Sequence, residues 1–169
     1  MSEPNRLPDA AALRAVFSRF PTGVAVIGVR TASGASGGMT ANALCSLSLD
    51  PLLVLVCFER EARTLPLVEE AGRFSVNILG ENDEALAKRF ASKLGEAEKL
   101  SSVPHHDELG LPVLEASIAW LACTVKEVLP GGDHAIVIGE VDALGSRDGK
   151  PLVWESGRYA RLATEPADQ

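Results

Sequence analysis

The sequence predicts a mainly β protein, an antiparallel barrel with a few helices packed outside it. About seven β-rich runs are separated by turn residues, whereas only a few stretches have the period of a helix. The strands do not alternate regularly with crossover helices, which argues against a doubly wound parallel sheet. The 169 residues, 46% of them hydrophobic, suffice for one domain with a substantial core. We expect a single domain over residues 1–169, with its core at about 13–162 and a short loose tail at 163–169.

The first predicted element is a helix. Asp9 is a suitable N-cap, and Pro21 to Gly23 end the helix. Between them, apolar residues recur at i, i+3, i+4 and i+7, which is typical of an amphipathic helix. These residues are Leu13, Val16, Phe17 and Phe20.

A hairpin is predicted next. Residues 24–29 are β-rich, and the Gly/Ser-rich stretch 31–38 favours a turn before a strand that runs to Asp50-Pro51. Alternate residues of that strand have two unlike faces. One face carries small neutral hydrogen-bonding side chains, interrupted only by Leu44: Thr40, Asn42, Ser46 and Ser48. The absence of Lys and Glu from this face suits a lining that meets a polar ligand away from solvent.

The remaining elements follow from the same patterns. Residues 52–58 predict a strand buried on both sides, and a further strand is expected at 74–79. Residues 59–72 predict a loop and a short helix that Thr64 could cap, and 81–94 fit a helix with Leu86, Phe90 and Leu94 on one face. Residues 101–112 are polar and are interpreted as an excursion. Three late strands are expected at 119–129, 135–144 and 152–154.

Composition excludes several classes of protein. The net charge of −7 argues against a nucleic-acid surface and against adhesion to anionic membranes. The longest apolar run, 52–58, is too short to span a bilayer, and the N-terminus lacks the pattern of a signal peptide. The three cysteines, Cys45, Cys57 and Cys123, are widely spaced in apolar runs. We expect buried, reduced thiols and a cytoplasmic protein.

Common catalytic motifs are absent from the sequence. GASGG is not a dinucleotide fingerprint, and no P-loop follows it. No CxxC or HExxH pattern is present, and adjacent His105 and His106 have diverging side chains, so no metal site is expected. No GxSxG elbow is found.

A few polar residues remain as candidates, each with two interpretations. His134 begins a strand after a turn and is either a surface residue or part of a site at a loop edge. Arg63 and Thr64 form either a phosphate site at a helix start or a capped helix with a solvated Arg. For Phe90, core packing is the default role.

Six segments occur in order along the chain: GMTANALCSLSLDPLLVLVCF, ART, GRFSVNIL, KRFASK, GDHAIVIGEV and PLVWESGRY. Together they closely resemble the flavin reductase-like, FMN-binding split-barrel family, which includes the small reductase components of two-component flavin monooxygenases. The resemblance covers about residues 13–162. It implies an antiparallel split β-barrel of Greek-key type with a few flanking helices, homodimeric, with FMN or FAD at the subunit interface.

The resemblance also implies roles for individual residues. The ring and ribityl chain would lie against Gly38, Met39, Thr40, Asn42 and Ala43, and Arg63 and Thr64 would hold the phosphate. Backbone groups of Cys57, Phe58 and Glu59 would pass near the ribityl and phosphate, and Arg89 and Phe90 would close the pocket. The nicotinamide side would comprise His134, Trp154, Glu155, Ser156, Gly157 and Tyr159. The implied reaction is hydride transfer from NADH or NADPH to the flavin, with the reduced flavin passing to a partner monooxygenase. No side chain has to move a proton in that step, so His134 would orient the nicotinamide.

Three alternatives remain open. One stays within the fold, a split-barrel flavin oxidase or a reductase that uses a deazaflavin. Another is a non-enzymatic carrier of flavin or haem on the same barrel. The third is a barrel without a ligand.

Overall fold

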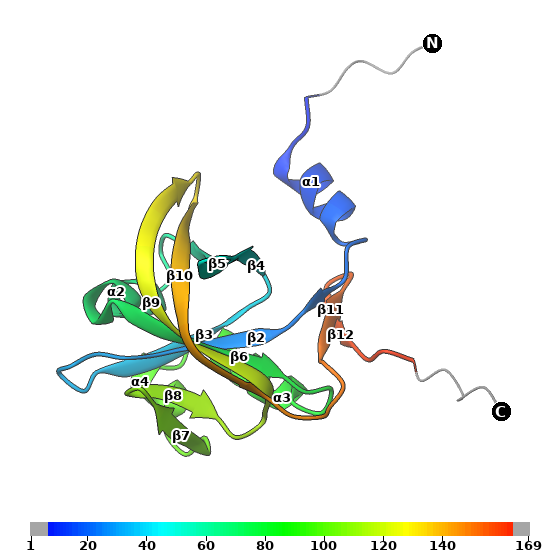
Figure 1. Ribbon diagram of the computed structural model, residues 1–169. Helices are drawn as coiled ribbons and strands as arrows, with labels where there is room; N and C mark the ends of the chain where they lie inside the picture. The colour runs from blue at the N-terminus through cyan, green and yellow to red at the C-terminus, as the bar shows by residue number, and fades with distance from the viewer. Residues whose placement is uncertain (1–6, 164–169) are drawn as a thin grey trace, which may run out of the picture.

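The computed structural model describes residues 7–163, and its main feature is a sheet of seven strands in the order β3-β2-β6-β9-β10-β5-β4 (Figure 1). The strands are β2 Ala25–Arg30, β3 Ser36–Ala41, β4 Leu44–Leu49, β5 Leu52–Glu59, β6 Arg73–Leu79, β9 Ser117–Gly131 and β10 His134–Ser146. Every neighbouring pair in this sheet is antiparallel. The prediction of a mainly β, antiparallel fold is confirmed. The part of the predicted loose tail from residue 164 onward lies outside the described residues.

The two edges of this sheet are connected by a very short link. β3 and β4 are the edge strands, and only Asn42 and Ala43 join them. Three Cα–Cα steps span at most about 11 Å, so the sheet has to curl until its edges approach each other. The N–H of Cys57 donates to the carbonyl oxygen of Ala43 at 2.9 Å, which ties the link to β5. The result is a barrel with a seam between β3 and the β4–β5 hairpin.

The shorter elements cover the barrel. The helices are α1 Ala10–Phe17, α2 Thr64–Ala71, α3 Glu84–Ala91 and α4 Glu96–Leu100, and the remaining strands are β1 Thr22–Gly23, β7 His105–Glu108, β8 Leu111–Leu114, β11 Val153–Glu155 and β12 Arg158–Ala160. Helices α2, α3 and α4 all pack against β3. Strands β1, β11 and β12 form a small separate sheet, and β7 and β8 form a hairpin.

Two hydrophobic clusters hold these layers together. The larger one fills the barrel, with Ile27, Phe58 and Phe74 fully buried at its centre. The smaller one lies beneath α3, where Phe90 packs with Leu79 and other buried apolar residues. Since burial of a large apolar side chain contributes about 1.5–3 kcal/mol, these clusters supply much of the stabilisation.

Two details of the predicted strands were wrong, and the predicted excursion contains strands that were not expected. The strand predicted from residue 38 to Asp50-Pro51 is two strands, broken at Asn42–Ala43, where the chain crosses from one sheet edge to the other. The alternation of side chains in the sequence does not reveal this crossing. Residues 52–58 are buried on one face only, with Leu53 and Leu55 half-buried on the other. The excursion at 101–112 contains most of the β7–β8 hairpin, whose Leu114 N–H donates to the buried Asn77 side chain at 2.8 Å.

Helix α1 lies apart from the barrel (Figure 1). Its predicted N-cap is confirmed, because the Asp9 carboxylate accepts a hydrogen bond from the N–H of Ala12 at 2.8 Å. Its apolar stripe, however, is exposed: Val16 is 68% accessible and Phe17 63%.

Burial in the barrel affects the titration of Cys123. Loss of solvation, with a smaller contribution from the charge of Asp142, raises the pKa of this thiol from about 9 to about 12. The unfolded thiol therefore ionises from about pH 9, whereas the folded thiol does not. Unfolding releases a proton in this window, so stability falls as pH rises.

A Cys123→Ala variant tests this linkage. We expect wild type to lose about 1.4 kcal/mol through this group between pH 7 and pH 10, a loss that the variant lacks. The measurement is urea unfolding of both proteins at the two pH values. An identical pH dependence of the two free energies of unfolding would show that Cys123 titrates normally.

Candidate functional site

A cavity of about 530 Å³ opens where β3 ends and its link meets β5. Four other segments complete its wall: the loop from β5 into α2, the region from α3 to α4, α4 itself, and the start of β10. The structure brings together ten of the predicted flavin and nicotinamide residues. They are Met39, Thr40, Asn42, Ala43, Cys57, Glu59, Arg63, Thr64, Phe90 and His134.

The middle of the cavity is neutral. It is lined by Met39 to Ala43, which combine small side chains with backbone at the free edge of β3. The Thr40 hydroxyl donates to the carbonyl oxygen of Ala87 at 2.6 Å, and the Asn42 amide nitrogen donates to the Thr22 hydroxyl at 3.2 Å. The predicted neutral lining is present here, but Ser46 and Ser48 lie on β4 and take no part in it.

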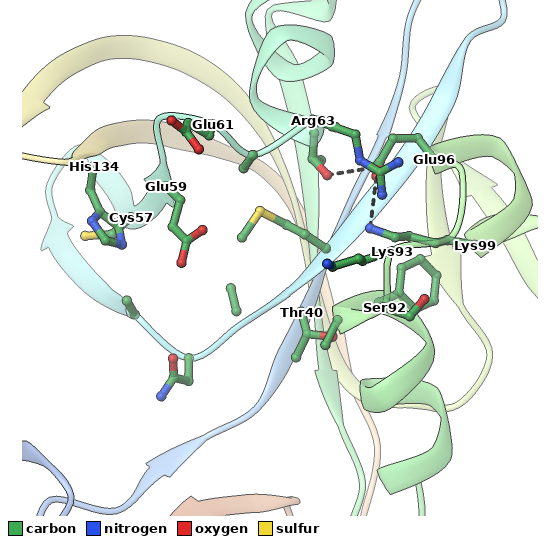
Figure 2. Close-up of a pocket in the computed structure, with 18 residues that line it drawn as sticks. Thr40, Cys57, Glu59, Glu61, Arg63, Ser92, Lys93, Glu96, Lys99 and His134 are labelled. Carbon is green, nitrogen blue, oxygen red and sulfur yellow. Dashed lines mark hydrogen bonds and ion pairs between the residues drawn. The ribbon is translucent and has the colours of Figure 1, made fainter. Parts of the chain in front are cut away.

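One end of the cavity carries cations (Figure 2). Arg63, Lys93 and Lys99 line it together with the carboxylate of Glu96. Arg63 donates to the carbonyl oxygen of Leu94 at 2.6 Å and lies 3.5 Å from Glu96. Thr64 is the first residue of α2, and its hydroxyl donates to Glu96 at 2.7 Å. The predicted N-cap role of Thr64 was therefore wrong, because its side chain turns toward α4.

The opposite end is acidic and holds His134 (Figure 2). β10 pairs with β5 so that His134 lies opposite Glu59, and Glu61 follows in the loop. Arg60 fixes the turn before His134, since its N–H donates to the carbonyl oxygen of Asp133 at 3.0 Å and its Nε donates to that of Gly132 at 2.9 Å.

The imidazole of His134 is oriented by its neighbour. Its Nδ1 lies 2.8 Å from the Asp133 carboxylate, and this hydrogen bond holds the pKa of Asp133 below its usual value. An ionised Asp133 accepts a hydrogen bond from the Nδ1–H of this ring, which leaves Nε2 as an acceptor. His134 is thus suited to accept a hydrogen bond from an amide of a ligand.

The cysteines differ in their exposure. Cys45 on β4 is exposed, so the prediction of burial was wrong for this residue, whereas Cys123 is fully buried. Cys57 lines the cavity and is half-buried; burial and then the nearby Cys45 raise the pKa of its thiol. All three thiols are free, as predicted. A raised pKa disfavours the thiolate, so Cys57 is a neutral wall residue and a poor nucleophile.

Three predicted flavin residues do not line the cavity. Phe58 points into the barrel core and is fully buried. Gly38 is buried behind the wall, with its N–H donated to Glu96 at 3.1 Å. Arg89 instead donates to carbonyl oxygens at the C-terminal end of α4, including that of Lys99 at 2.7 Å. Position in a motif did not reveal that the Arg89 side chain points away from the seam.

The predicted nicotinamide residues at the C-terminal end of the chain border two adjoining hollows. Trp154 and Tyr159 line one of about 230 Å³ that shares Thr40 and Asn42 with the main cavity. Their rings meet edge to face, with centroids 4.9 Å apart. Trp154, Ser156 and Gly157 line the other, of about 570 Å³, together with Phe17 of α1. Glu155 lines neither of these hollows, so the structure brings four of these five residues near the seam.

Several cavity residues were missed by sequence reasoning. They are Ala41, Glu61, Ala62, Ala91, Ser92, Lys93, Glu96 and Lys99. The segment KRFASK contains Ser92 and Lys93 and could have indicated them. Glu96 and Lys99 gave no signal, because α4 was not predicted. Among residues 7–163, no group of three or more His, Cys, Asp or Glu side chains could share a metal ion. In the same range, no helix is long and apolar enough to cross a bilayer.

The arrangement suits an elongated ligand with a neutral planar part and an anionic tail. Backbone and amide groups along the neutral middle can hydrogen-bond to ring oxygens and nitrogens. The cationic end can hold a phosphate. A volume of about 530 Å³ lies within the usual range of roughly 300–1,000 Å³ for small-molecule sites.

Comparison with known proteins gives consistent matches along nearly the whole chain. Residues 17–163 match the family described as "Flavin reductase like domain". The chain is 36% identical over 152 residues to an NADH-dependent flavin reductase of a Rhodococcus species, covering 89% of this chain and 85% of the relative. It is 35% identical over 161 residues to the reductase subunit HsaB of a flavin-dependent monooxygenase of Mycobacterium tuberculosis, covering 93% of this chain and 84% of that one. Among solved structures, flavin reductase PheA2 superposes with a TM-score of 0.86 at 37% identity, covering 93% of this chain and 100% of PheA2.

Proposed function

Because the chain belongs to the flavin reductase like family and is an oxidoreductase that reduces flavin with a nicotinamide hydride donor, we propose that the cavity at the seam holds the flavin. The observation that carries this assignment is the division of one cavity into a neutral middle and a cationic end. The isoalloxazine ring is uncharged when oxidised, and the ribityl phosphate is an anion. FMN or FAD therefore matches the two parts of the cavity in order.

The phosphate is assigned to the cationic end. Thr64 is engaged with Glu96 and is nearly inaccessible, so it is a weaker candidate than the sequence suggested. Lys93 makes no hydrogen bond or ion pair with any residue in 7–163, and its ammonium group points into the cavity (Figure 2). We assign the phosphate to Lys93 and the accessible part of Arg63, with Ser92 beside them.

The ring is assigned to the link between β3 and β4. Backbone groups from Met39 to Ala43 and the side chains of Thr40 and Asn42 can hydrogen-bond to its polar edge. Phe90 forms part of the cavity floor. Donors fixed in place before the reaction stabilise charge that develops on the ring without reorganising.

The nicotinamide is assigned to the side of His134 and the Trp154–Tyr159 pair. When bound, the flavin accepts the hydride, and the chemistry is that of the two cofactors. The protein has to hold the rings about 3–3.5 Å apart and keep water out. His134 contributes an acceptor for the carboxamide, and Glu59 and Glu61 surround it with negative charge. NADH is the first donor to test, since the Rhodococcus relative is named as NADH-dependent.

Two further proposals concern assembly with other protein chains. The exposed stripe of α1 and exposed Leu47 and Leu49 of β4 support a homodimer with the flavin at the interface. The match to HsaB supports delivery of reduced flavin to a partner monooxygenase. The cytoplasmic location expected from the sequence stays a prediction.

The visible absorption of added FMN tests the function. In an anaerobic cuvette with catalytic protein and excess FMN, NADH or NADPH is expected to bleach the flavin over many turnovers. Protein that binds FMN but bleaches it with neither donor would be a carrier. Protein that binds deazaflavin and not FMN would be the deazaflavin-dependent alternative. Bleaching only after a different substrate is added would indicate an oxidase.

The role of His134 is tested by His134→Ala. We expect the KM for NADH to rise three- to tenfold, the value of one lost hydrogen bond, while the Kd of FMN changes less than twofold. His134→Gln, whose amide oxygen can replace Nε2, should recover part of the loss, and His106→Ala on β7 serves as a remote control. Steady-state kinetics and a flavin titration measure both constants. A large loss of FMN affinity would place His134 on the flavin.

A further inference from the structure

The carboxylate of Glu96 occupies a complete set of anion-binding donors at the cationic end of the cavity (Figure 2). Its Oε2 accepts from the Thr64 hydroxyl at 2.7 Å and from the N–H of Gly38 at 3.1 Å. Its Oε1 accepts from Lys99 Nζ at 2.9 Å, and a guanidinium nitrogen of Arg63 lies 3.5 Å away. A hydroxyl, a backbone N–H, an ammonium and a guanidinium are the groups that proteins use to hold a phosphate.

The backbone of β3 is built to bring this carboxylate close. A Cβ on Gly37 would lie 2.7 Å from the Cβ of Glu96 and 2.8 Å from its Oε2. Only a residue without a side chain allows α4 to approach β3 so closely. The Glu96 side chain is therefore held at the cavity wall, where only 13% of its surface is accessible.

This carboxylate changes the charge that a ligand meets. Lys99 is 4% accessible and forms a close ion pair with Glu96, so its charge is largely compensated. Arg63 is partly compensated by the same group. Of the three cations that line this end, Lys93 is the one that has no ion pair with a residue in 7–163. A phosphate entering the cavity therefore meets a weaker field than three cations would produce.

We propose that Glu96 is a specificity-determining residue that lowers the affinity for phosphorylated flavin relative to riboflavin. This inference rests on the proposed function, because it takes the cationic end as the phosphate site. Its consequence is an exchangeable flavin: the ring is recognised by neutral contacts, and the anionic tail is held loosely enough to leave after reduction. A purely structural Glu96–Lys99 pair would instead support both flavins equally.

Three variants separate these roles by charge: Glu96→Gln, Lys99→Met and the double variant. The measured quantity is the ratio of the Kd of FMN to the Kd of riboflavin, from fluorescence titrations at fixed ionic strength. Glu96→Gln should tighten FMN about five- to tenfold and leave riboflavin unchanged, the effect of one charge several ångströms away. Lys99→Met should weaken FMN by a similar factor. The double variant should return the ratio to that of wild type. Glu96→Asp keeps the negative charge and should leave the ratio at the wild-type value.

The outcomes distinguish the two levels of the argument. Glu96→Gln leaves the buried ammonium of Lys99 without an ion pair, and Lys99→Met leaves the Glu96 carboxylate with Arg63 alone, so folding is checked by circular dichroism. The double variant has neither of these buried charges and serves as the folded control. If Glu96→Gln does not fold, an unchanged ratio in Lys99→Met overturns the proposal. Equal changes for FMN and riboflavin in the single variants also overturn it and leave the flavin site standing. Wild-type protein that binds neither flavin overturns both proposals.

Discussion

The Phe90→Ala variant is expected to lose about 3–5 kcal/mol of its free energy of unfolding. Phe90 is 1% accessible and lies in the smaller core cluster, beneath α3. Its ring also packs against the backbone of β3, since a Cβ placed on Gly38 would lie 2.9 Å from a carbon of that ring. Removing the ring leaves a cavity between α3 and β3 that the surrounding residues only partly fill.

Thermal and urea unfolding measure this effect. A loss of that size corresponds to a fall in Tm of roughly 6–20 °C for a chain of this length. Phe90→Leu keeps most of the volume and should lose less than half as much. Because Phe90 also lines the cavity, FMN binding of the folded Ala variant should weaken as well. A loss below about 1 kcal/mol would show that the ring does not anchor α3.

The Lys93→Met variant is expected to bind FMN about ten- to a hundredfold more weakly, while its affinity for riboflavin stays within twofold of wild type. A hydrogen bond to a charged group contributes about 1.5–3 kcal/mol, and each 1.4 kcal/mol is a factor of ten. Lys93 is exposed, so solvent screening favours the lower end of this range. Methionine keeps the length and apolar stem of lysine and removes only the charge.

Lys126→Met is a matched control for this variant. Lys126 forms a surface ion pair with Glu140 at 2.7 Å and does not line the cavity, yet its replacement changes the net charge equally. Titrations of both flavins against the three proteins give the comparison. Equal weakening of FMN and riboflavin in Lys93→Met would place this residue on the ring or the ribityl chain and reject the phosphate role.

Much of the fold follows from local patterns. The Asp9 cap, the β2–β3 hairpin and the long strands β9 and β10 have unambiguous signals, and the structure contains all of them. The break at Asn42–Ala43 has no such signal, because small residues continue the alternation across it. Its cause is global, since the chain has to pass from one sheet edge to the other.

The residues of the candidate site also fall into those that the sequence predicted and those that only the folded structure reveals. Motifs shared with a family identify positions along the chain, and so they located the residues around Thr40, Cys57 and Arg63. They do not report where a side chain points, which is why Arg89 was expected at the cavity. Glu96 and Lys99 were not predicted, because their helix has only five residues. Their effect on the charge of the cavity arises from contacts with residues that are distant in the sequence. Charge compensation between distant residues is a property of the folded structure.

The two-residue link between the sheet edges has a consequence for how this scaffold can change. The length of this link sets the distance between β3 and β5, and hence the width of the cavity opening between them. An added residue at Asn42–Ala43 would lengthen the link without disturbing any strand pairing. A wider ligand should therefore be accommodated by insertions in this link rather than by substitutions in the barrel wall.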